Sequence, residues 1–483
     1  MTHPLNVLVL MSDEHNPAFM GCAGHPFIQT PNLDRLAARG TRFTHAYTCS
    51  PICVPARAAF ATGRYVHEIG FWDNADAYDG SIPSWHHVLR QAGHDAVSIG
   101  KLHFRGRAGD DHGWTEEILP MHVIDGLGDI KGLVRENIPV RKGGDKMAKL
   151  AGPGESTYTA YDRDIGQTAC DWLKARGQQT ADKPWVLFVS MVAPHFPLTA
   201  PARWYEYYAA MDLPMPKLYD KAVRPHHPFT DEYARVVDYD THFHSSQDVR
   251  RAVTGYSGLV SFMDEQMGQV LAALDQSGMA GDTLVIYTSD HGDNLGARGL
   301  WGKSTMYEES AGVPMILVGP GVAAGQVLAE PVSHVDCAVT ILQAAGAPAL
   351  PQASGQSLLD LAQGAAPTRA VLSEYHAIGC TAGATMLRHG RFKYCHYVDH
   401  PAQLFDLQAD PEELQDLAGQ PAHLADLQAC EQALRALLDP DAVNKRAKKR
   451  QHELLAGQGG REAALARGDL GFTPAPGTEA AFN

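Results

Sequence analysis

The sequence predicts an α/β protein in which a large, doubly wound mixed sheet is flanked by helices and followed by a smaller C-terminal α+β domain. Short apolar runs alternate with helical patterns over most of the chain, which is typical of such a sheet. Near residue 366 the pattern changes to short runs separated by turns, and 483 residues suffice for a large core. We expect a main α/β domain over residues 1–365, a subdomain over residues 366–440 and a tail over residues 441–483.

The main domain is predicted to begin with a buried strand and a helix. Residues 6–11 form a continuous apolar run, as expected of a central strand covered on both faces, and Asp13 falls just past its end. Residues 30–40 begin with threonine and proline and end in glycine, which predicts a helix. Residues 84–91 repeat this pattern and precede a candidate strand over residues 95–99.

The later part of the main domain continues the alternation. Residues 185–192 and 283–288 are candidate buried strands, and residues 258–276 place apolar side chains on one helical face. Ligands bind beyond the carboxyl ends of the strands in such sheets, so we expect the functional site there. Residues 105–183 and 200–250 have weak periodicity, and we expect them to form insertions around the site.

The subdomain is predicted to contain a small antiparallel sheet and a helical stretch. Its three candidate strands, with a turn at His389-Gly390, are residues 370–375, 386–388 and 391–397. The helical stretch starts at Asp410 and runs to about residue 438, with a break near Gly419. In the tail, the basic run over residues 445–450 fits either a solvated face or a contact with another subunit.

The composition is that of a folded protein without a nucleic-acid partner. Hydrophobic residues make up 45% and charged residues 20% of the chain, close to the globular average. The formal net charge of −15 argues against nucleic-acid binding, because phosphate binding needs a basic face. A small basic pocket within an acidic surface can still bind a small anion.

The sequence also predicts a cytoplasmic protein with no membrane anchor. The apolar run after Pro4 is too short and wrongly flanked for a signal peptide. No run of about 18 apolar residues occurs, so no membrane span is expected. The eight cysteines are scattered without the spacing of a disulfide framework, which suits free thiols in a reducing compartment.

The run Cys53-Val-Pro-Ala-Arg57, followed by Thr62-Gly63-Arg64, is a candidate nucleophile site. Cysteine is often buried, so Cys53 could also be a core thiol and Arg57 a surface cation. A phosphatase loop needs a longer spacing between its cysteine and its arginine, and Cys49 is too far from Cys53 for the C-x-x-C pattern of a zinc or redox site. The run alone is compatible with two interpretations of Cys53: a buried thiol of the core, or the precursor of a catalytic residue.

Acidic residues end two of the predicted strands. Asp13, with Glu14 beside it, follows the first strand, and Asp290-His291 follows the strand over residues 283–288. Carboxylates with an adjacent histidine are the ligands of a hard cation such as Ca²⁺, Mg²⁺ or Mn²⁺. Taken singly, such aspartates are more often helix caps or turn residues. The two strand ends together predict a candidate metal site.

The motifs of this chain, in their order, resemble those of type I sulfatases in the alkaline phosphatase superfamily. Residues 6–13 resemble the first metal strand of that family, and residues 53–64 resemble its nucleophile loop and helix. Further along the chain, Gly100-Lys-Leu-His103 resembles the G-K-x-H motif of the family, and Pro194-His-Phe-Pro197 resembles its P-H-x-P motif. Ser289-Asp-His-Gly292 resembles its second metal strand, and Lys303, with Tyr307-Glu308 after it, matches the lysine that follows that strand.

The resemblance implies an alkaline phosphatase-like fold and the hydrolysis of sulfate monoesters to inorganic sulfate. It implies that Cys53 is oxidised to formylglycine by a formylglycine-generating enzyme or equivalent, and that the hydrated aldehyde is the nucleophile. A covalent sulfo-enzyme intermediate divides one difficult displacement into two steps. The resemblance also implies one divalent cation, Ca²⁺ or Mn²⁺ with Mg²⁺ as a further possibility, whose ligands are Asp13, Asp290, His291 and the oxygen of modified Cys53, with Glu14 as a weaker or outer ligand.

The other roles follow from the same resemblance. Arg57 and Lys101 would hold formylglycine and the substrate sulfate, and His103 would take the proton of the second hydroxyl so that the intermediate collapses. His195 and Lys303 would contact the sulfate and the leaving oxygen, with one of them as general acid. The basic tail resembles the C-terminal extension through which related enzymes assemble, so a homo-oligomer, a dimer or a tetramer, is expected.

Two details place the chain nearer to choline sulfatases and phosphonate monoester hydrolases. The pair Asp290-His291 resembles those enzymes, whereas Asp-Asn is common elsewhere in the family. The stretch Phe71-Trp-Asp-Asn-Ala75 resembles choline sulfatases, which makes Asn74 a candidate pocket residue. A phosphonate monoester hydrolase or phosphodiesterase with the same nucleophile is the alternative. Phosphonate hydrolases of this resemblance lack the G-K-x-H motif, so Lys101 and His103 favour sulfate.

Three further hypotheses stay open at this point. If Cys53 remains a thiol, the chain is an inactive anion-binding or metal-binding protein of this fold. Two histidine pairs in the second insertion could bind metal, although solvated loop histidines are the simpler interpretation: His226-His227 and His242-x-His244. Three tryptophans could form a cage for a quaternary ammonium group, although aromatic residues are more often part of the core: Trp72, Trp85 and Trp301.

Overall fold

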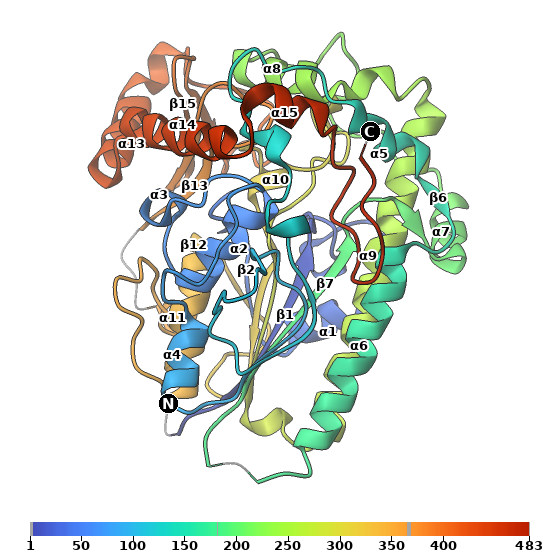
Figure 1. Ribbon diagram of the computed structural model, residues 1–483, viewed down its shortest axis with the longest axis vertical. Coiled ribbons are helices and arrows are strands. Elements are labelled where there is room, and N and C mark those ends of the chain that lie inside the picture. The colour runs from blue at the N-terminus through green and yellow to red at the C-terminus, as the bar shows by residue number, and fades with distance from the viewer. Residues whose placement is uncertain (1–2, 181, 365–368, 483) are drawn as a thin grey trace.

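The computed structural model describes residues 3–180, 182–364 and 369–482. The expected boundary between main domain and subdomain, at residues 365 and 366, lies outside these described residues. An eight-stranded mixed sheet with the order β11-β2-β10-β9-β1-β7-β4-β5 forms the centre of the molecule (Figure 1). Its strands are β1 (Asn6–Asp13), β2 (Thr41–Phe43), β4 (Ala96–Lys101), β5 (Glu116–Met121), β7 (Val186–Pro194), β9 (Thr283–Ser289), β10 (Met315–Val318) and β11 (Gln326–Leu328).

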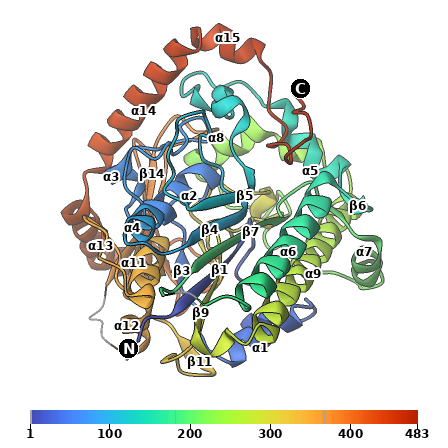
Figure 2. The same cartoon turned by 60° about the horizontal axis from the view of Figure 1, so that its bottom comes forward.

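Helices cover both faces of this sheet (Figure 2). One face carries α1 (Pro31–Ala38), α6 (Thr157–Arg176) and α9 (Ser246–Gln276), and the other carries α2 (Cys53–Thr62), α4 (Trp85–Gln91) and α11 (His334–Ala345). Strand β1 shows why both layers are needed. Its alternate side chains are buried in two different apolar clusters, with Leu8 and Leu10 in one and Val7 and Val9 in the other. This arrangement confirms the predicted doubly wound α/β fold.

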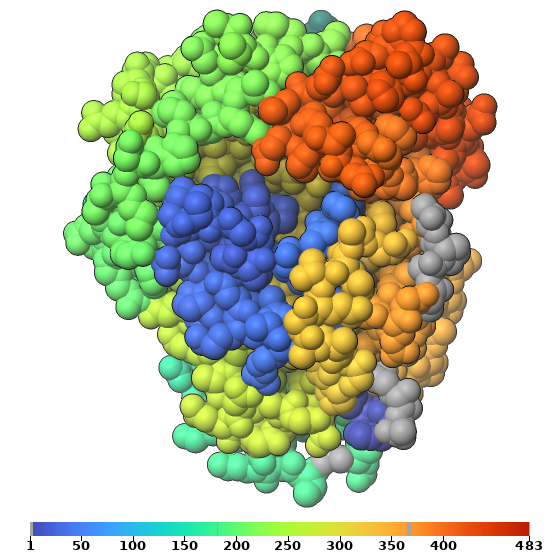
Figure 3. Space-filling view, turned by 180° about the vertical axis from the view of Figure 1, so that it is seen from behind, coloured from blue at the N-terminus to red at the C-terminus, as the bar shows by residue number. Residues whose placement is uncertain are grey.

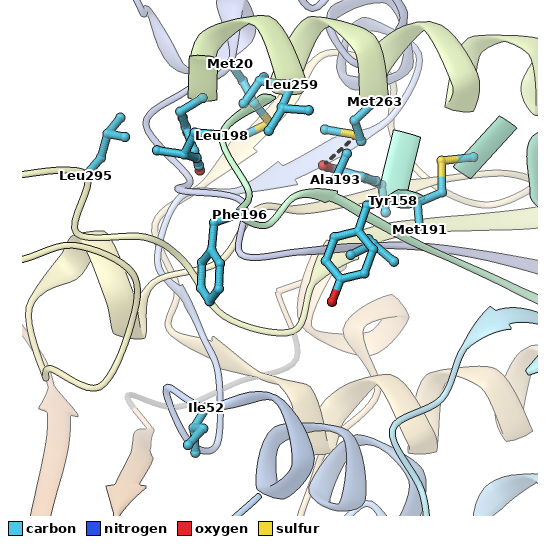
Figure 4. Close-up of a cluster of buried hydrophobic side chains, with 14 of the residues drawn as sticks. Met20, Ile52, Tyr158, Met191, Ala193, Phe196, Leu198, Leu259, Met263 and Leu295 are labelled. Carbon is cyan, nitrogen blue, oxygen red and sulfur yellow. Dashed lines mark hydrogen bonds between the residues drawn. The ribbon is translucent and has the colours of Figure 1, made fainter. Parts of the chain in front are cut away.

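The predicted elements of the main domain are present; one helix, α9, is longer than the sequence pattern predicts, and another, α6, was not predicted. Helix α9 starts at Ser246, well before the predicted start at residue 258. Helix α6 lies inside the segment 105–183, whose periodicity is weak because its buried face mixes tyrosines and small residues with Ile165 and Leu173. Side chains of α9, such as Leu259 and Met263, lie close to residues at the end of β7 (Figure 4).

Shorter elements connect the layers. The short helices are α3 (Val66–Ile69), α5 (Lys146–Lys149), α7 (Ala202–Ala209), α8 (Pro228–Val237), α10 (Glu308–Ala311) and α12 (Leu358–Ala362). The short strands are β3 (Ala46–Tyr47), β6 (Gly152–Pro153), β8 (Thr199–Ala200) and β12 (Val332–Ser333). Among the described residues, no helix is both long enough and apolar enough to cross a bilayer. The eight cysteines are free thiols.

The C-terminal subdomain is built on a four-stranded antiparallel sheet in the order β13-β14-β15-β16. Its strands are β13 (Ala370–Tyr375), β14 (Ala384–His389), β15 (Phe392–Tyr397) and β16 (Gln403–Asp406). The first three confirm the predicted strands, and β16 is additional. Seen from behind, the subdomain, in orange to red, adjoins the green segment that contains residues 200–250 (Figure 3). At this border Nε2 of His227 donates to the carbonyl oxygen of Pro401 at 2.8 Å.

The helical stretch predicted from Asp410 is wrong in its first part. Residues 410–420 form turns and loop, and helix α13 spans Leu424–Leu437. Glu413 gives the reason, because it has a left-handed backbone with φ 52° and its buried carboxylate pairs with Nζ of Lys393 at 2.8 Å. A tertiary ion pair thus overrides the local helix preference of this segment.

The tail is largely helical and packs on its own chain. It contains α14 (Pro440–Gly457) and α15 (Gly460–Ala466), which cross the upper end of the molecule in Figure 1. From the basic run, Arg446 donates to the carbonyl oxygen of His67 at 2.6 Å, and Arg450 pairs with Asp76 at 3.0 Å. The basic run therefore holds α14 against the main domain.

Candidate active site

The candidate site lies at the carboxyl ends of the central parallel strands. Neighbouring strand pairs bring these ends together, because Asp13 of β1 is in register with Pro194 of β7, and Gly100 of β4 with Ser190 of β7. A cavity of about 150 Å³ opens there. Its lining includes most of the residues singled out from the sequence, namely Cys53, Asn74, Lys101, His103, His195 and Lys303. The cavity thus lies beyond the strand ends, where the functional site is expected.

Aromatic and aliphatic side chains form the rest of the cavity wall. Tyr158 of α6 and Phe196, just after β7, point toward the side on which Ile52 lies (Figure 4). The lining continues with Tyr233, Val237, Tyr239, Ile378 and Phe472. These residues could not be identified from the sequence, since isolated aromatic side chains in weakly periodic segments give no local signal.

Cys53 is the first residue of α2 and lies at the centre of the site. Its Sγ is 3.1 Å from Nε2 of His291, 3.2 Å from Nζ of Lys303 and 3.8 Å from Oδ1 of Asp13. Burial, with the nearby Asp13 carboxylate, raises the pKa of the thiol to about 12 in spite of the lysines. The encoded cysteine is therefore a protonated and weakly nucleophilic thiol at neutral pH.

Arg57, one helical turn after Cys53, is fully engaged with the strand ends. Its Nε donates to Asp290 at 2.8 Å, Nη2 donates to Asp13 at 3.0 Å, and Nη1 donates to the carbonyl oxygen of Lys101 and to Oγ of Ser190. Only about 3% of its side chain is exposed. The guanidinium therefore fixes the two carboxylates of the predicted metal site relative to α2, and the interpretation of Arg57 as a surface cation is wrong.

Asp13 is shared between the predicted metal site and the basic residues. Its Oδ2 lies 2.6 Å from Nζ of Lys101, and its Oδ1 faces Cys53. Burial alone would raise the pKa of Asp13, but the basic neighbours outweigh burial and hold the pKa well below its usual value: Lys101, His195, Arg57 and Lys303. Asp13 is therefore ionised at neutral pH.

Glu14 occupies a strained and buried position beside Asp13. Its backbone has φ 69°, and Oε2 lies 3.4 Å from both Nε2 of His195 and Nζ of Lys303. Burial raises the pKa of Glu14 to about 8. Its Oε1 is buried and has no hydrogen-bond partner within the described part of the chain. A buried polar atom needs a partner, and carboxylate oxygens are ligands of hard cations, so Oε1 of Glu14 is suited to be an inner or outer ligand of a cation.

His291 has a ring orientation suited to metal binding. Its Nδ1 lies 3.0 Å from the carbonyl oxygen of Gly292, which can only accept, so the proton belongs on Nδ1. The lone pair of Nε2 then points toward Cys53. Four side chains form a group whose potential ligand atoms all lie within 4.8 Å of one another: Asp13, Cys53, Asp290 and His291.

The charges of the site also favour a cation. Four buried acidic side chains, Asp13, Glu14, Asp290 and Asp293, face three basic ones, Arg57, Lys101 and Lys303. Burial raises the pKa of Asp293 to about 6, so Asp293 is ionised at neutral pH, whereas Glu14, whose pKa is about 8, keeps its proton. A divalent cation at this place would favour the ionised form of Glu14 and balance its charge. The donor set thus fits a hard divalent cation in its oxygen content, charge and ring tautomer.

His103 lines the opposite part of the cavity and contacts an unexpected partner. Its Nε2 lies 2.8 Å from Oγ1 of Thr473, in the C-terminal tail. Its Nδ1 is buried and has no hydrogen-bond partner among the described residues. Burial lowers the pKa of His103 well below its usual value, so the ring is neutral. The sequence could not reveal Thr473, because 370 positions separate it from His103.

The structure settles the remaining candidates from the sequence. Oδ1 of Asn74 accepts the backbone N–H of Val54 at 3.1 Å, which places the amide against the start of α2. The three tryptophans do not form a cage, because they pack in separate places against His376, Trp114 and Phe243, respectively. None of the four insertion histidines joins a cluster of metal-ligating side chains in the described residues, and His227 is buried rather than solvated.

The similarity to known proteins agrees with this geometry. The sequence model described as "Sulfatase" matches residues 5–347, and the one described as "N-sulphoglucosamine sulphohydrolase, C-terminal" matches residues 296–439. Two relatives in sequence match most of the chain. Choline-sulfatase of Rhizobium meliloti is 33% identical over 422 residues, which cover 86% of this chain and 82% of that protein. Arylsulfatase K of Rattus norvegicus is 30% identical over 441 residues, which cover 86% and 74%, respectively.

Solved structures share the fold. Phosphonate monoester hydrolase of Agrobacterium radiobacter superposes with a TM-score of 0.71 at 22% identity, covering 90% of this chain and 95% of that chain. A protein solved in complex with its substrate D-glucosamine-2-N,6-O-disulfate also gives 0.71 at 22% identity, covering 92% and 99%.

The fold and the site together define a hydrolase of anionic esters, and the chain belongs to the sulfatase family. Within that family it is a type I sulfatase of the alkaline phosphatase superfamily, and its enzyme class is that of the sulfuric ester hydrolases. The family resemblance found in the sequence is thereby confirmed.

Proposed function

We propose that this enzyme hydrolyses sulfate monoesters with a formylglycine derived from Cys53 and with one divalent cation beside it. The placement of Cys53 carries the proposal. A buried thiol whose pKa is about 12 is a poor nucleophile, yet it lies at the start of a helix, in a cavity, within 3.2 Å of Lys303. Conversion by a formylglycine-generating enzyme or equivalent gives this position a chemical role.

The residues around Cys53 fit both groups. Hydrated formylglycine supplies a hydroxyl nucleophile, and the cation supplies positive charge for the oxygens of the sulfate. The residues that would hold the cation are Asp13, Asp290, His291 and the oxygen of modified Cys53, with Glu14 as a further ligand. Oxygen ligands with one imidazole suit Ca²⁺ or Mn²⁺, and Mg²⁺ is also compatible.

The other side chains then have separate tasks. Arg57 holds the two ligating aspartates in place, and Lys101, beside Asp13, presents its ammonium to the sulfate. His195 and Lys303 approach the site from the side of Glu14, and we assign them to the sulfate and the leaving oxygen, with one of them as general acid. His103 accepts the hydroxyl proton of residue 53 on Nδ1, the ring nitrogen that has no hydrogen-bond partner among the described residues.

Rates on two substrates test this function against its alternative. The related fold of phosphonate monoester hydrolases favours that activity as the second candidate. We expect the purified enzyme to hydrolyse an aryl sulfate much faster than a phosphonate monoester, because Lys101 and His103 serve the sulfate reaction. A large preference for the phosphonate would contradict the assignment, and inactivity of a chain that keeps the Cys53 thiol would favour a binding protein.

The proposal includes the cellular location, the assembly and the substrate class of the enzyme. The seven cysteines other than Cys53 are free thiols, which supports a cytoplasmic location. We keep an assembly into a dimer or a tetramer as part of the proposal, on the resemblance of the basic tail to the C-terminal extension of related enzymes. A small-molecule sulfate ester, with an aryl, choline or sugar alcohol, is the expected substrate.

A further inference from the structure

The last part of the tail returns to the active site. After α15 the chain runs back toward α5 and α6, where it contacts Lys146 and Tyr158; it is the dark red loop in Figure 1. Five consecutive residues, 469–473, line the same cavity as Cys53. We call residues 469–473 the C-terminal strap.

The strap is anchored at its first residue by buried charges. The carboxylate of Asp469 lies 2.8 Å from Nζ of Lys131 and 3.0 Å from Nε of Arg141, and Oδ2 accepts the backbone N–H of Lys142 at 2.7 Å. Asp469 is fully buried. Buried carboxylates are retained when they are paired in this way, so this contact fixes where the strap enters the cavity.

The middle of the strap packs against the cavity wall. Nζ of Lys146 donates to the carbonyl oxygen of Gly471 and lies 4.3 Å from the centroid of the Phe196 ring. The ring of Phe472 meets Tyr158 edge-on, with 5.1 Å between ring centroids. The strap is therefore a packed part of the wall, and its aromatic residue faces the cavity beside Tyr158.

The strap ends on His103. The Oγ1 of Thr473 lies 2.8 Å from Nε2 of His103, and the hydroxyl of Tyr158 donates to the carbonyl oxygen of Thr473. If Nε2–H donates to Thr473, Nδ1 keeps its lone pair and can accept a proton. The opposite arrangement would leave a buried Nδ1–H without an acceptor among the described residues, which is costly.

We infer that the C-terminal strap is a substrate-selecting wall of the active site and that Thr473 is a positioning residue for His103. The inference rests on the proposed function for the role of His103. The hydrogen bond that Nε2–H of His103 donates to Oγ1 of Thr473 holds the tautomer whose Nδ1 can accept the hydroxyl proton of residue 53. The ring of Phe472 limits the leaving group to a compact alcohol, because the cavity of about 150 Å³ is smaller than the roughly 300 Å³ or more of common ligand pockets.

Isosteric variants separate hydrogen bonding from packing at Thr473. Thr473→Val fills the same space without the hydroxyl. We expect kcat on an aryl sulfate to fall about tenfold or more, and KM to change less than about twofold. A fall of this size is a part of the roughly 10²–10⁴-fold rate enhancement that a proton-transfer residue typically gives. Thr473→Ser should restore kcat. Equal kcat values for the wild type and Thr473→Val would overturn the positioning role.

Phe472→Ala tests the wall, with Phe482→Ala as a control in the same tail, because the ring of Phe482 is 39% exposed. For each enzyme we compare kcat/KM on a naphthyl or disaccharide sulfate with kcat/KM on a small alkyl sulfate. We expect Phe472→Ala to raise this ratio about tenfold, which is within the range by which pocket side chains change substrate preference. An unchanged ratio would contradict the wall.

A second measurement makes the result independent of turnover. Peptide mass spectrometry can follow the labelling of residue 53 by a small and by a bulky reagent, iodoacetamide and a naphthyl maleimide for the thiol, or methoxyamine and a biotin hydrazide for the aldehyde. The variant Phe472→Ala should gain labelling by the bulky reagent only. If no sulfate ester is hydrolysed but the labelling gain occurs, the proposed function is wrong, whereas the role of the strap as a wall of the cavity is supported. If sulfate esters are hydrolysed but the labelling gain is absent, the role of the strap as a wall is wrong.

Discussion

Nε of Arg57 donates a hydrogen bond to Oδ2 of Asp290 at 2.8 Å, and neither side chain is more than 3% exposed. This pair joins the helix that starts at Cys53 to the carboxyl end of β9. The same guanidinium also holds Asp13 at the end of β1. The residue assigned as nucleophile and the carboxylates assigned as metal ligands thus share one rigid connection, as a reaction that needs fixed geometry requires.

Removal of Arg57 should therefore affect both stability and activity. We expect Arg57→Ala to lower the free energy of unfolding by about 3–5 kcal/mol, because two buried carboxylates lose their partner. Denaturant unfolding measures this change. As a control, Arg90→Ala breaks an ion pair with the exposed carboxylate of Asp111 and should cost less than about 1 kcal/mol. An equally small effect at Arg57 would show that its carboxylates are stabilised in another way.

Loss of Cys53 should abolish turnover without unfolding the protein. Cys53→Ala removes the atom that becomes the nucleophile, so we expect no hydrolysis of an aryl sulfate above background. Cys49→Ala is a matched control, because Cys49 is also buried, lies nearby in sequence, and has its Sγ beside Ser333 at 3.4 Å, outside the cavity. Its activity should remain close to that of the wild type. Residual turnover in Cys53→Ala would rule out this residue as the nucleophile.

Removal of the cation should lower both activity and melting temperature. A ligand at one hundred times its Kd stabilises the folded state by about 2.7 kcal/mol, so dialysis against a chelator should give a measurable fall in Tm, reversed by Ca²⁺, Mn²⁺ or Mg²⁺. In Asp290→Asn and His291→Ala the added ion should no longer raise Tm. A Tm response that persists in these variants would place the ion at another site.

Lys146 should make stability depend on pH. Burial, with repulsion from Arg141 and Lys303, lowers the pKa of Lys146 to about 7, whereas a lysine in the unfolded chain titrates near 10.4. Between these pH values the unfolded state binds more protons, so the contribution of Lys146 to the free energy of unfolding rises as the pH is raised from 7 to 10.

Two methionine variants on α5 isolate this contribution. Thermal unfolding of Lys146→Met at several pH values should show a smaller rise between pH 7 and pH 10 than the wild type does. Lys149→Met serves as the control, because the side chain of Lys149 is 71% exposed and forms an ion pair with Asp145. Identical pH profiles for Lys146→Met and the wild type would show that Lys146 is not held neutral in the folded state.

Much of the fold and the site could be predicted because the relevant signals are local. The continuous apolar run of β1 predicts a strand covered on both faces, and Leu8 and Val9 indeed pack in different clusters. Proline after Thr30 predicts the start of α1. The short motifs around Cys53 and Lys101 place each functional residue at an element end, and parallel strands bring those ends to one edge of the sheet.

The parts that could not be predicted depend on contacts between distant segments. Residues 410–420 carry a helix-start pattern, but the ion pair of Glu413 with Lys393 holds them in turns. The strap gives no sequence signal, because Thr473 matters only through its contact with His103. The orphaned Oε1 of Glu14 likewise becomes visible only when the side chains around it are known.

The central claim is that Cys53 becomes a formylglycine and is then the nucleophile. The most direct test is the mass of the peptide that contains residue 53, taken from protein of the native host that hydrolyses an aryl sulfate. Conversion of a thiol to an aldehyde predicts a mass about 18 Da below the encoded value. An active enzyme whose peptide carries only the unmodified cysteine would contradict the account.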